Sequence, residues 1–418
     1  MSDTKEVAVV GGGVAGLVAA RCLGASGFEV TVYDKNAEVG GRVRSAKRDG
    51  FVFDRGFQVF FTAYPEARRE LDYERLDLRY FDPGAEIAHG GRVSTVSDPL
   101  RKPTDLLPTV LSRAATVGDK LRLMGLRATV GRKSPRQIFE GTDTSIRDYL
   151  VSKGFSDRFI EAFAEPFYGG ITLDPSLSTS KKVFEFTFKM MSEGKVGVPS
   201  GGMGEIPAQI ARRAESNGVR IRRGDWVEEI GDDATLKVDG ETYEYDAVVV
   251  ATDPKEARRL TRADNIPTEA RSCVTQYYEL DLSETRMGKR ILLNADTSKP
   301  NHVVPLSNVA PEYTPDGVEM ASAVFMGLPN EDDDGLRRKT QSLLEKQYGV
   351  GDLELLHTDR IEFAQFAQPP GIHSRLPSNR LSEGHDVYLA GEFTEASSIN
   401  AAMASGRKAA QAVEEDLG

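Results

Sequence analysis

Residues 5–34, KEVAVVGGGVAGLVAARCLGASGFEVTVYD, contain the clearest indication of the fold class. The apolar run of residues 5–10 is typical of a buried parallel strand, and residues 14–26 carry apolar side chains at helical spacing. A second strand is predicted over residues 29–33, and it ends at Asp34. The stretch therefore predicts a strand–helix–strand unit and, with it, an α/β fold.

Three glycines at the turn between the first strand and the helix, Gly11, Gly13 and Gly16, form the pattern G-x-G-x-x-G. In such a pattern the first glycine permits a tight turn, the second lets the backbone approach a pyrophosphate, and the third lets helix and strand pack closely. The N–H groups at the start of the helix attract phosphates, and Asp34 would accept hydrogen bonds from a ribose. We therefore predict a Rossmann-like dinucleotide-binding domain; the alternative is a glycine-rich turn in an ordinary strand–helix–strand unit.

The next residues, 34–45 (DKNAEVGGRVRS), resemble the segment that follows the second strand in flavin amine oxidases, protoporphyrinogen oxidases and phytoene desaturases. In these families G-G-R places an arginine on the FAD pyrophosphate, and Arg42 has that position here. The families usually have glutamate where this chain has Asp34. An acidic residue there disfavours the 2′-phosphate of NADP, so the resemblance implies FAD as the cofactor.

Residues 50–61 (GFVFDRGFQVFF) resemble the second flavin-contacting stretch of the family, in which D-x-G passes the ring system. Asp54 and Gly56 occupy those positions, and Gln58 follows where relatives often have a histidine or another polar residue. Glutamine can hydrogen-bond a flavin or a substrate but cannot act as a base at pH 7. The alternative for this stretch is a purely structural hydrophobic hairpin.

The remaining motifs of the resemblance lie in residues 198–252 and 387–407. Residues 198–204 (VPSGGMG) resemble the P-x-G-G-M signature, and residues 387–407 resemble the C-terminal FAD motif, whose helix start would stabilise the anion of reduced flavin. The resemblance implies that the backbone near Val227 contacts the adenine end of FAD. The full set of cofactor-binding residues that it implies is Gly11, Gly13, Val14, Ala15, Gly16, Asp34, Lys35, Gly41, Arg42, Val43, Gly56, Val227, Ala251, Thr252, Gly391, Glu392, Ser398 and Ile399.

The length of 418 residues predicts two domains, because single hydrophobic cores stop growing at about 250–300 residues. We expect a discontinuous FAD-binding domain made of residues 1–62, 197–262 and 376–418. An inserted α+β substrate-binding domain would comprise residues 63–196 and 263–375. Its first part should be mixed in character, with a helix that starts at Asp174-Pro175, and its second part should form an antiparallel sheet. Within the FAD-binding domain we expect a small antiparallel meander over residues 219–222, 226–230, 235–238 and 241–245, followed by the apolar strand of a buried parallel sheet over residues 246–252.

The composition of the chain limits the classes of macromolecule that it is expected to bind. With 53 Lys and Arg against 64 Asp and Glu, the net charge of -11 argues against nucleic acid or an anionic membrane as the main partner. Basic residues recur between residues 101 and 133; a solvated helix face is the simplest explanation, and an attraction to anionic lipid or substrate is the alternative.

No apolar run approaches the ~20 residues of a membrane span, and residues 1–6 leave no room for a secretory signal before the first strand. We therefore expect a cytoplasmic protein, with peripheral membrane contact left open.

The chain has two cysteines, Cys22 and Cys273, and five histidines without metal-ligand spacing. We expect no metal site, no disulfide-exchange chemistry and FAD that is held without a covalent bond.

The resulting hypothesis is an FAD-dependent oxidoreductase in which a substrate gives hydride to flavin N5. The aromatic-rich middle of the chain favours a hydrophobic substrate, through isoprenoid or carotenoid-like desaturation or porphyrinogen-like oxidation, with an amine as the alternative. Catalytic residues stay unassigned; the substrate-side candidates are Gln58, Tyr168 and His302, each of which could instead be structural. Ser398 stands about where monoamine oxidases place a cage tyrosine, which makes a simple amine substrate less expected.

No second dinucleotide module is visible in the sequence, so oxygen, a quinone or another acceptor would reoxidise the flavin. An alternative of another class is a non-catalytic scaffold for lipids or prenylated proteins, like the Rab GDP-dissociation inhibitors, which share this architecture but lack an intact flavin signature.

Overall fold

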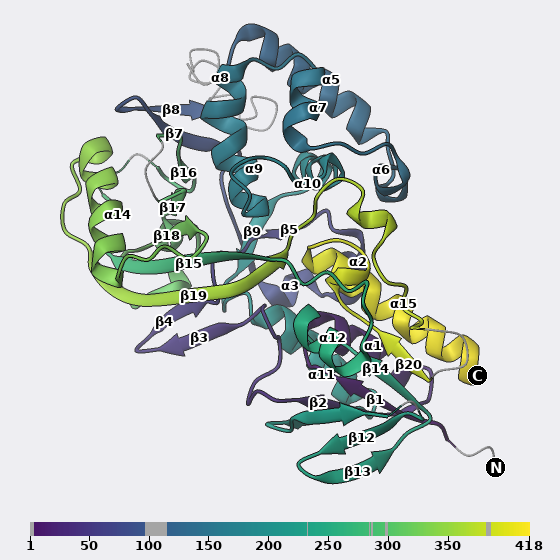
Figure 1. The fold of residues 1–418 in the computed structure, drawn as a ribbon. Helices are drawn as coiled ribbons and strands as arrows, with labels where there is room; N and C mark the ends of the chain where they lie inside the picture. Colours follow the sequence, from purple (N-terminus) through teal and green to yellow (C-terminus); the bar gives the residue numbers. More distant parts are fainter. Residues whose placement is uncertain are drawn as a thin grey trace.

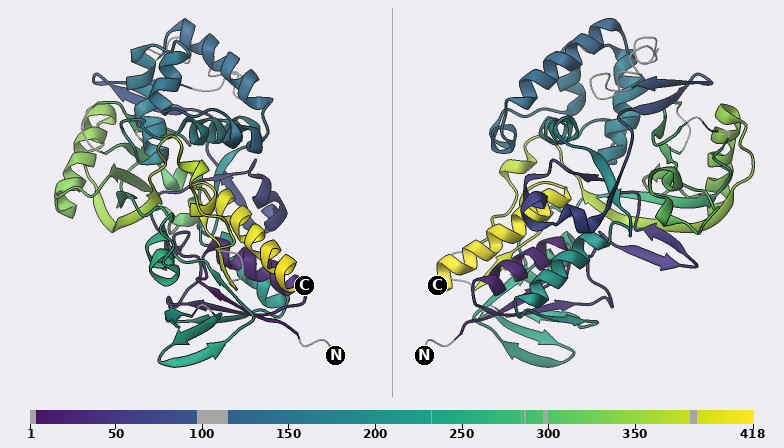
Figure 2. Two further views of the ribbon diagram at one scale, coloured as in Figure 1. Left: turned by 45° about the vertical axis from the view of Figure 1, so that its right-hand side comes forward. Right: turned by 180° about the vertical axis from the view of Figure 1, so that it is seen from behind.

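The computed structural model describes residues 4–96, 115–231, 233–283, 285, 287–296, 300–381 and 386–418. Figure 1 shows two halves: a parallel sheet with its helices near the two termini, and a larger mixed sheet beneath a group of helices. Figure 2 shows the same two halves after a 45° turn and from behind.

The first half is built on a five-stranded sheet in the order β10-β2-β1-β14-β20, in which all neighbouring strands run parallel. Its strands are β1 (Glu6–Val10), β2 (Glu29–Asp34), β10 (Arg220–Arg223), β14 (Ala247–Val250) and β20 (Val387–Leu389). This arrangement confirms the predicted Rossmann-like α/β fold. The strand predicted over residues 219–222 was expected in an antiparallel meander, but it pairs with β2 at the edge of the parallel sheet.

Alternating side chains of β1 separate two layers of core. Val7 and Val9 face the helices α1 (Val14–Ala25), α11 (Glu205–Ser216) and α15 (Ile399–Leu417), whereas Ala8 and Val10 belong to the core beneath the meander. The meander consists of β11 (Val227–Ile230), β12 (Thr235–Val238) and β13 (Glu241–Glu244), with α12 (Pro254–Thr261) beside it. Helix α15 packs so closely on α1 that a Cβ added at Gly406 would lie 2.2 Å from the carbonyl oxygen of Ala15. Only glycine fits at this position.

The second half contains a seven-stranded sheet in the order β19-β15-β18-β17-β16-β7-β8. Its strands are β7 (Ala85–His89), β8 (Arg92–Val96), β15 (Ala270–Glu279), β16 (Ile291–Asn294), β17 (His302–Val304), β18 (Met320–Met326) and β19 (Glu354–Phe366). The predicted antiparallel pairing holds throughout, except that β16 and β7 run parallel. Helix α14 (Asp333–Tyr348) packs against this sheet through Leu336 and Leu344.

Helices cover the top of this sheet in Figure 1. They are α5 (Val117–Gly131), α6 (Pro135–Glu140), α7 (Ile146–Ser152), α8 (Asp157–Phe159), the π-helical turn η2 (Ile160–Ala164), α9 (Glu165–Thr172) and α10 (Lys181–Glu193). The sequence suggested a helix start at Asp174-Pro175, which is wrong. The Asp174 carboxylate instead accepts bonds from the residues of a buried turn, such as Thr179 N at 2.8 Å, and the next helix begins at Lys181.

Short elements join the two halves. They are the hairpin β3 (Ser45–Arg48) and β4 (Phe51–Asp54), the three strands β5 (Phe60–Phe61), β6 (Leu78–Tyr80) and β9 (Val196–Pro199), and the helices α2 (Pro65–Glu70), α3 (Tyr73–Leu76) and α13 (Leu306–Val309). Among the described helices, none is both long enough and apolar enough to cross a bilayer. The described residues also contain no group of three or more His, Cys, Asp or Glu side chains that could hold a metal ion.

Candidate functional site

A single cavity of about 2610 Å³ extends from the parallel sheet into the second half of the molecule and is lined by residues of both halves. Sites for one small molecule usually measure about 300–1,000 Å³. This cavity is several times larger, so it has room for a dinucleotide and a second large molecule.

The nucleotide end of the cavity lies at the carboxyl ends of three parallel strands, where ligands of such sheets bind. Gly11 follows β1 with φ +109°, and a Cβ added there would lie 2.6 Å from the carbonyl oxygen of Ala251 after β14. A Cβ added at Gly16 would lie 2.0 Å from the carbonyl oxygen of Gly11. At Gly13, by contrast, an added Cβ would meet no described atom within 4 Å. Two glycines therefore permit tight packing, and Gly13 leaves open space beside the helix.

Helix α1 begins directly after Gly13, and among the described residues no side chain caps its N-terminus. Gly13, Val14 and Ala15 line the cavity, so the first N–H groups of the helix are available to an anion there. This open, uncapped helix start fits the pyrophosphate of FAD.

Asp34, at the end of β2, is buried and borders the same cavity. One carboxylate oxygen accepts from Gly12 N at 2.8 Å, and the other accepts from the backbone N and side-chain Nδ2 of Asn36, both at 2.8 Å. These bonds fix the carboxylate, whose further lone pairs can accept from a ribose hydroxyl.

Two predicted cofactor residues from distant parts of the chain meet in the cavity. Arg42 Nη1 forms an ion pair with Glu392 and donates to the carbonyl of Ala364 at 3.1 Å, while its guanidinium lies 5.7 Å from the centre of the Phe363 ring. Ser397 Oγ also donates to Glu392, at 2.6 Å. A guanidinium has five N–H donors, so Arg42 can contact an anionic group in addition to Glu392.

The start of α15 is the second helix N-terminus at the cavity. Ser398 is its N-cap, and the Ser398 hydroxyl oxygen accepts from Ala401 N at 3.0 Å. Both Ser398 and Ile399 line the cavity. The positive end of α15 therefore points at this site, as the resemblance implied.

Within the described part of the chain, the cavity brings together all of the predicted cofactor residues except Gly16, which packs behind the turn. They are Gly11, Gly13, Val14, Ala15, Asp34, Lys35, Gly41, Arg42, Val43, Gly56, Val227, Ala251, Thr252, Gly391, Glu392, Ser398 and Ile399.

The three substrate-side candidates also line the cavity. Gln58 Nε2 donates to the carbonyls of Arg42 at 2.9 Å and Arg55 at 3.1 Å, so its amide is held by the backbone. Tyr168 is buried, and burial raises its pKa far above the usual value. Burial lowers the pKa of His302 to about 3, and its Nδ1 lies 2.7 Å from Asn301 Oδ1. At neutral pH both Tyr168 and His302 are therefore uncharged, and His302 is a weak base.

The wall opposite the nucleotide end is aromatic. The rings of Phe159, Phe163 and Phe167 follow one another along α8, η2 and α9 with centroid distances of 5.3 and 5.2 Å, and all three line the cavity. From α10, Phe188 and Met191 line the same space. The four-residue spacing of the phenylalanines is visible in the sequence, whereas their common cavity is not.

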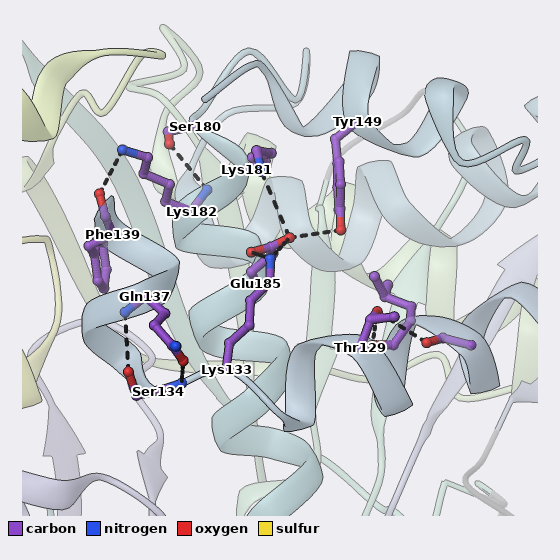
Figure 3. A network of polar contacts seen from close by, with 12 residues as sticks. Thr129, Lys133, Ser134, Gln137, Phe139, Tyr149, Ser180, Lys181, Lys182 and Glu185 are labelled. Atoms are coloured by element: carbon purple, nitrogen blue, oxygen red, sulfur yellow. Dashed lines mark hydrogen bonds and ion pairs between the residues drawn. The ribbon is translucent and has the colours of Figure 1, made fainter. Parts of the chain in front are cut away.

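A buried carboxylate holds α10 in place (Figure 3). Lys133 Nζ lies 2.8 Å from one oxygen of Glu185 and 3.0 Å from the other, and Tyr149 OH donates to Glu185 at 2.8 Å. Lys181 lies 3.9 Å away on the same helix. This network joins the end of α5 and helix α7 to the helix that carries part of the aromatic wall.

Sequence reasoning missed two features of the cavity. One is Trp226, which stands beside the predicted contact Val227. The other is an exposed apolar stripe on α5, formed by Val117, Leu121 and Met124 at the cavity rim. The single tryptophan and the i, i+4, i+7 spacing were available as signals, but neither indicates exposure.

Several known proteins are similar to this chain. Protoporphyrinogen oxidase 2 of Arabidopsis thaliana is 28% identical over 181 residues, which cover 43% of this chain and 35% of that protein. A 4,4′-diapophytoene desaturase of Staphylococcus aureus (strain Newman) is 51% identical over 300 residues, covering 61% of this chain and 57% of that protein. The chain thus spans between about a third and just over half of the length of these curated relatives.

Among solved structures, an oxidoreductase from Methanosarcina mazei has the same fold, with a TM-score of 0.74 at 18% identity over 98% of this chain and 100% of that chain. The model of the flavin-containing amine oxidoreductases matches residues 14–414, from the first turn of α1 to the last turns of α15. Because that match covers nearly the whole chain, the chain belongs to the flavin-containing amine oxidoreductase family, a family of FAD-dependent oxidoreductases.

Proposed function

We propose that this protein binds FAD without a covalent bond and oxidises a bulky apolar substrate by hydride transfer to the flavin. The observation that carries the proposal is the continuity of one cavity from the glycine turn after β1 to the aromatic wall on α8, η2, α9 and α10. When bound, FAD supplies the hydride acceptor, and the protein supplies binding, orientation and exclusion of water.

Each end of the cavity has a separate task in this proposal. The N-terminus of α1 and Arg42 would hold the pyrophosphate, Asp34 the ribose, and the positive end of α15 would favour the anion of the reduced cofactor. Gly41 and Gly56 would let the backbone approach the cofactor closely, and Val43 would pack beside it. We also propose the division into an FAD-binding domain of residues 1–62, 197–262 and 376–418 and a substrate-binding domain of residues 63–196 and 263–375.

The chemistry of the wall favours an isoprenoid, carotenoid-like or porphyrinogen-like substrate over an amine. Tyr168 and His302 both stay uncharged at neutral pH, so neither compensates the charge of an ammonium group. A charge buried without a partner costs several kcal/mol. An amine that binds in its neutral form is the second candidate, which the family's own chemistry supports.

Cys273 borders the cavity, but burial raises its thiol pKa to about 12. A thiol that stays protonated is a poor nucleophile, which supports a non-covalent cofactor. Oxygen, a quinone or another acceptor would then reoxidise the flavin.

We further propose that α5 contacts a lipid surface from which an apolar substrate enters. Val117, Leu121 and Met124 are 69%, 64% and 62% exposed and follow each other along one helical face at the cavity rim. Lys120 and Arg127, also at the rim, give this end of the cavity positive charge toward anionic lipid headgroups.

The test is anaerobic reduction of the flavin in purified holoprotein by phytoene, protoporphyrinogen IX or benzylamine, the apolar substrates being delivered in detergent. We expect the visible flavin absorbance to bleach with one of the two apolar substrates and not with benzylamine. In Phe167→Ala the concentration for half-maximal bleaching should rise about tenfold, because the wall loses a ring, whereas reduction by dithionite should be unchanged.

Bleaching by benzylamine alone would contradict the apolar substrate. A colourless protein that cannot be reconstituted with FAD would contradict the whole proposal and favour a binding scaffold.

A further inference from the structure

We propose that Trp226 is an aromatic platform on which the adenine of FAD stacks. This inference depends on the proposed function in one respect only, namely that the protein binds FAD. Trp226 is the single tryptophan of the chain, it lines the cavity, and 48% of its surface is exposed. Tryptophan is usually buried to a high degree, so a ring left half open on a ligand cavity needs an explanation.

The position of Trp226 relative to the ribose site gives the first argument. It stands in the loop between β10 and β11, and this loop is tied to the end of β2: Gly224 N donates to the carbonyls of Asp34 at 2.8 Å and Asn36 at 3.1 Å. In dinucleotide-binding folds the acidic residue at the end of the second strand binds the ribose of the adenosine. The loop that carries Trp226 is thus held beside Asp34, and both residues line the cavity, which places the ring on the side of the base that this ribose carries.

The second argument is that the ring is already oriented. The Arg259 guanidinium lies 5.8 Å from the ring centre, and the indole N–H faces the carboxylate of Glu256, whose pKa it helps to lower. Arg259 is itself held by Glu256 at 2.7 Å and by the carbonyl of Glu228 at 2.9 Å. Helix α12 thus covers one face of the indole and directs its N–H, which leaves the exposed part of the ring bordering the cavity.

An oriented ring can bind a planar base with little loss of side-chain freedom. Base–aromatic stacking, as measured by alanine substitution, corresponds to about a 5- to 150-fold change in affinity per base. Removal of the ring should therefore weaken ligands that contain adenine and leave those that lack it unaffected.

The experiment uses the full-length apoprotein and three probes: ADP, FAD and FMN, which lacks the adenosine. Binding is followed by tryptophan emission for the wild type and by calorimetry for the wild type, Trp226→Ala and Trp226→Phe. We expect ADP to quench or shift the emission of Trp226. We expect Trp226→Ala to weaken ADP and FAD about 5- to 150-fold with FMN unchanged, and Trp226→Phe to recover most of that loss.

Two results would contradict the role of Trp226 but not the binding of FAD. One is that ADP binds equally well to the wild type and to Trp226→Ala. The other is that Trp226→Ala loses FMN and FAD affinity equally, which would indicate a structural role for the ring. Wild-type protein that binds neither FAD nor FMN would overturn the proposed function as well, so the two failures are distinguishable.

Discussion

At the scale of single residues, Asp54 has the least usual surroundings. Its carboxylate is buried at the end of β4, where it accepts from Ser45 Oγ at 2.5 Å, Met203 N at 2.8 Å and Tyr313 OH at 2.8 Å. Burial raises the pKa of Asp54 from 3.8 to about 6, although these hydrogen bonds act in the opposite direction. Asp54 therefore connects residues from distant parts of the chain by hydrogen bonds, while its burial disfavours the charged form of the carboxylate.

We predict that Asp54 makes the protein less stable as the pH rises from about 4 to 6. A carboxyl with a raised pKa binds its proton more tightly in the folded chain than in the unfolded one. Its contribution is thus largest below 3.8 and is lost as the pH passes through about 6. The shift corresponds to about 3 kcal/mol of unfolding free energy.

Urea unfolding of wild type and Asp54→Asn at several pH values measures this contribution as the difference between the two proteins. That difference should fall by about 2.4 kcal/mol between pH 4 and pH 7, because part of the full shift lies below pH 4. Asp49→Asn, on the exposed turn of the same hairpin, is the matched control and should follow the wild type. A difference that does not vary with pH would show that Asp54 is charged throughout.

At the scale of elements, the exposed apolar stripe of α5 predicts that the protein binds lipid bilayers. An apolar helix face flanked by cations binds anionic bilayers through buried apolar area and headgroup attraction. We predict that the protein sediments with vesicles of phosphatidylglycerol and phosphatidylcholine. Leu121→Asp with Met124→Asp should weaken that partition at least about tenfold, since it places two charges on the inserted face.

The control for this prediction is Val151→Asp, which changes a residue that is 55% exposed on α7. It should bind vesicles like the wild type. Equal binding by the α5 variant and the wild type would place any membrane contact elsewhere.

Local patterns predicted the elements that carry a signal of their own. The glycine turn and the periodicity predicted β1, α1 and β2, and the uninterrupted apolar run of β14 predicted a buried parallel strand, although its partner β1 lies about 240 residues away. β10 was misplaced because its sequence, Arg220–Arg223, has no such apolar run and nothing local marks its pairing with β2. The charge states of Tyr168 and His302 could not be predicted either, because they depend on burial by distant segments.

At the scale of the whole molecule, the cavity makes the two halves share one ligand site. We predict that FAD at about 100 times its dissociation constant adds about 2.7 kcal/mol to the free energy of unfolding. Both halves should gain this stability together, because residues of both line the cavity.

The measurement is urea unfolding with and without FAD, followed by Trp226 emission for the first half and by circular dichroism for the whole chain. The two midpoints should coincide and shift together. In Arg42→Ala the shift at the same FAD concentration should be smaller, whereas in Arg48→Ala, on the exposed hairpin, it should be unchanged. A shift seen by emission alone would show that the halves unfold separately.

The π-helical turn η2 allows a single deletion to change which side chains form the aromatic wall. Such a turn has one residue more than a regular helical turn, and each residue of an α-helix rotates the following side chains by about 100°. Deletion of one residue within Ile160–Ala164 would turn Phe167 and Tyr168 away from the cavity and present their neighbours instead. A single-codon deletion could thus exchange the surface offered to the substrate while the nucleotide-binding turn stays untouched.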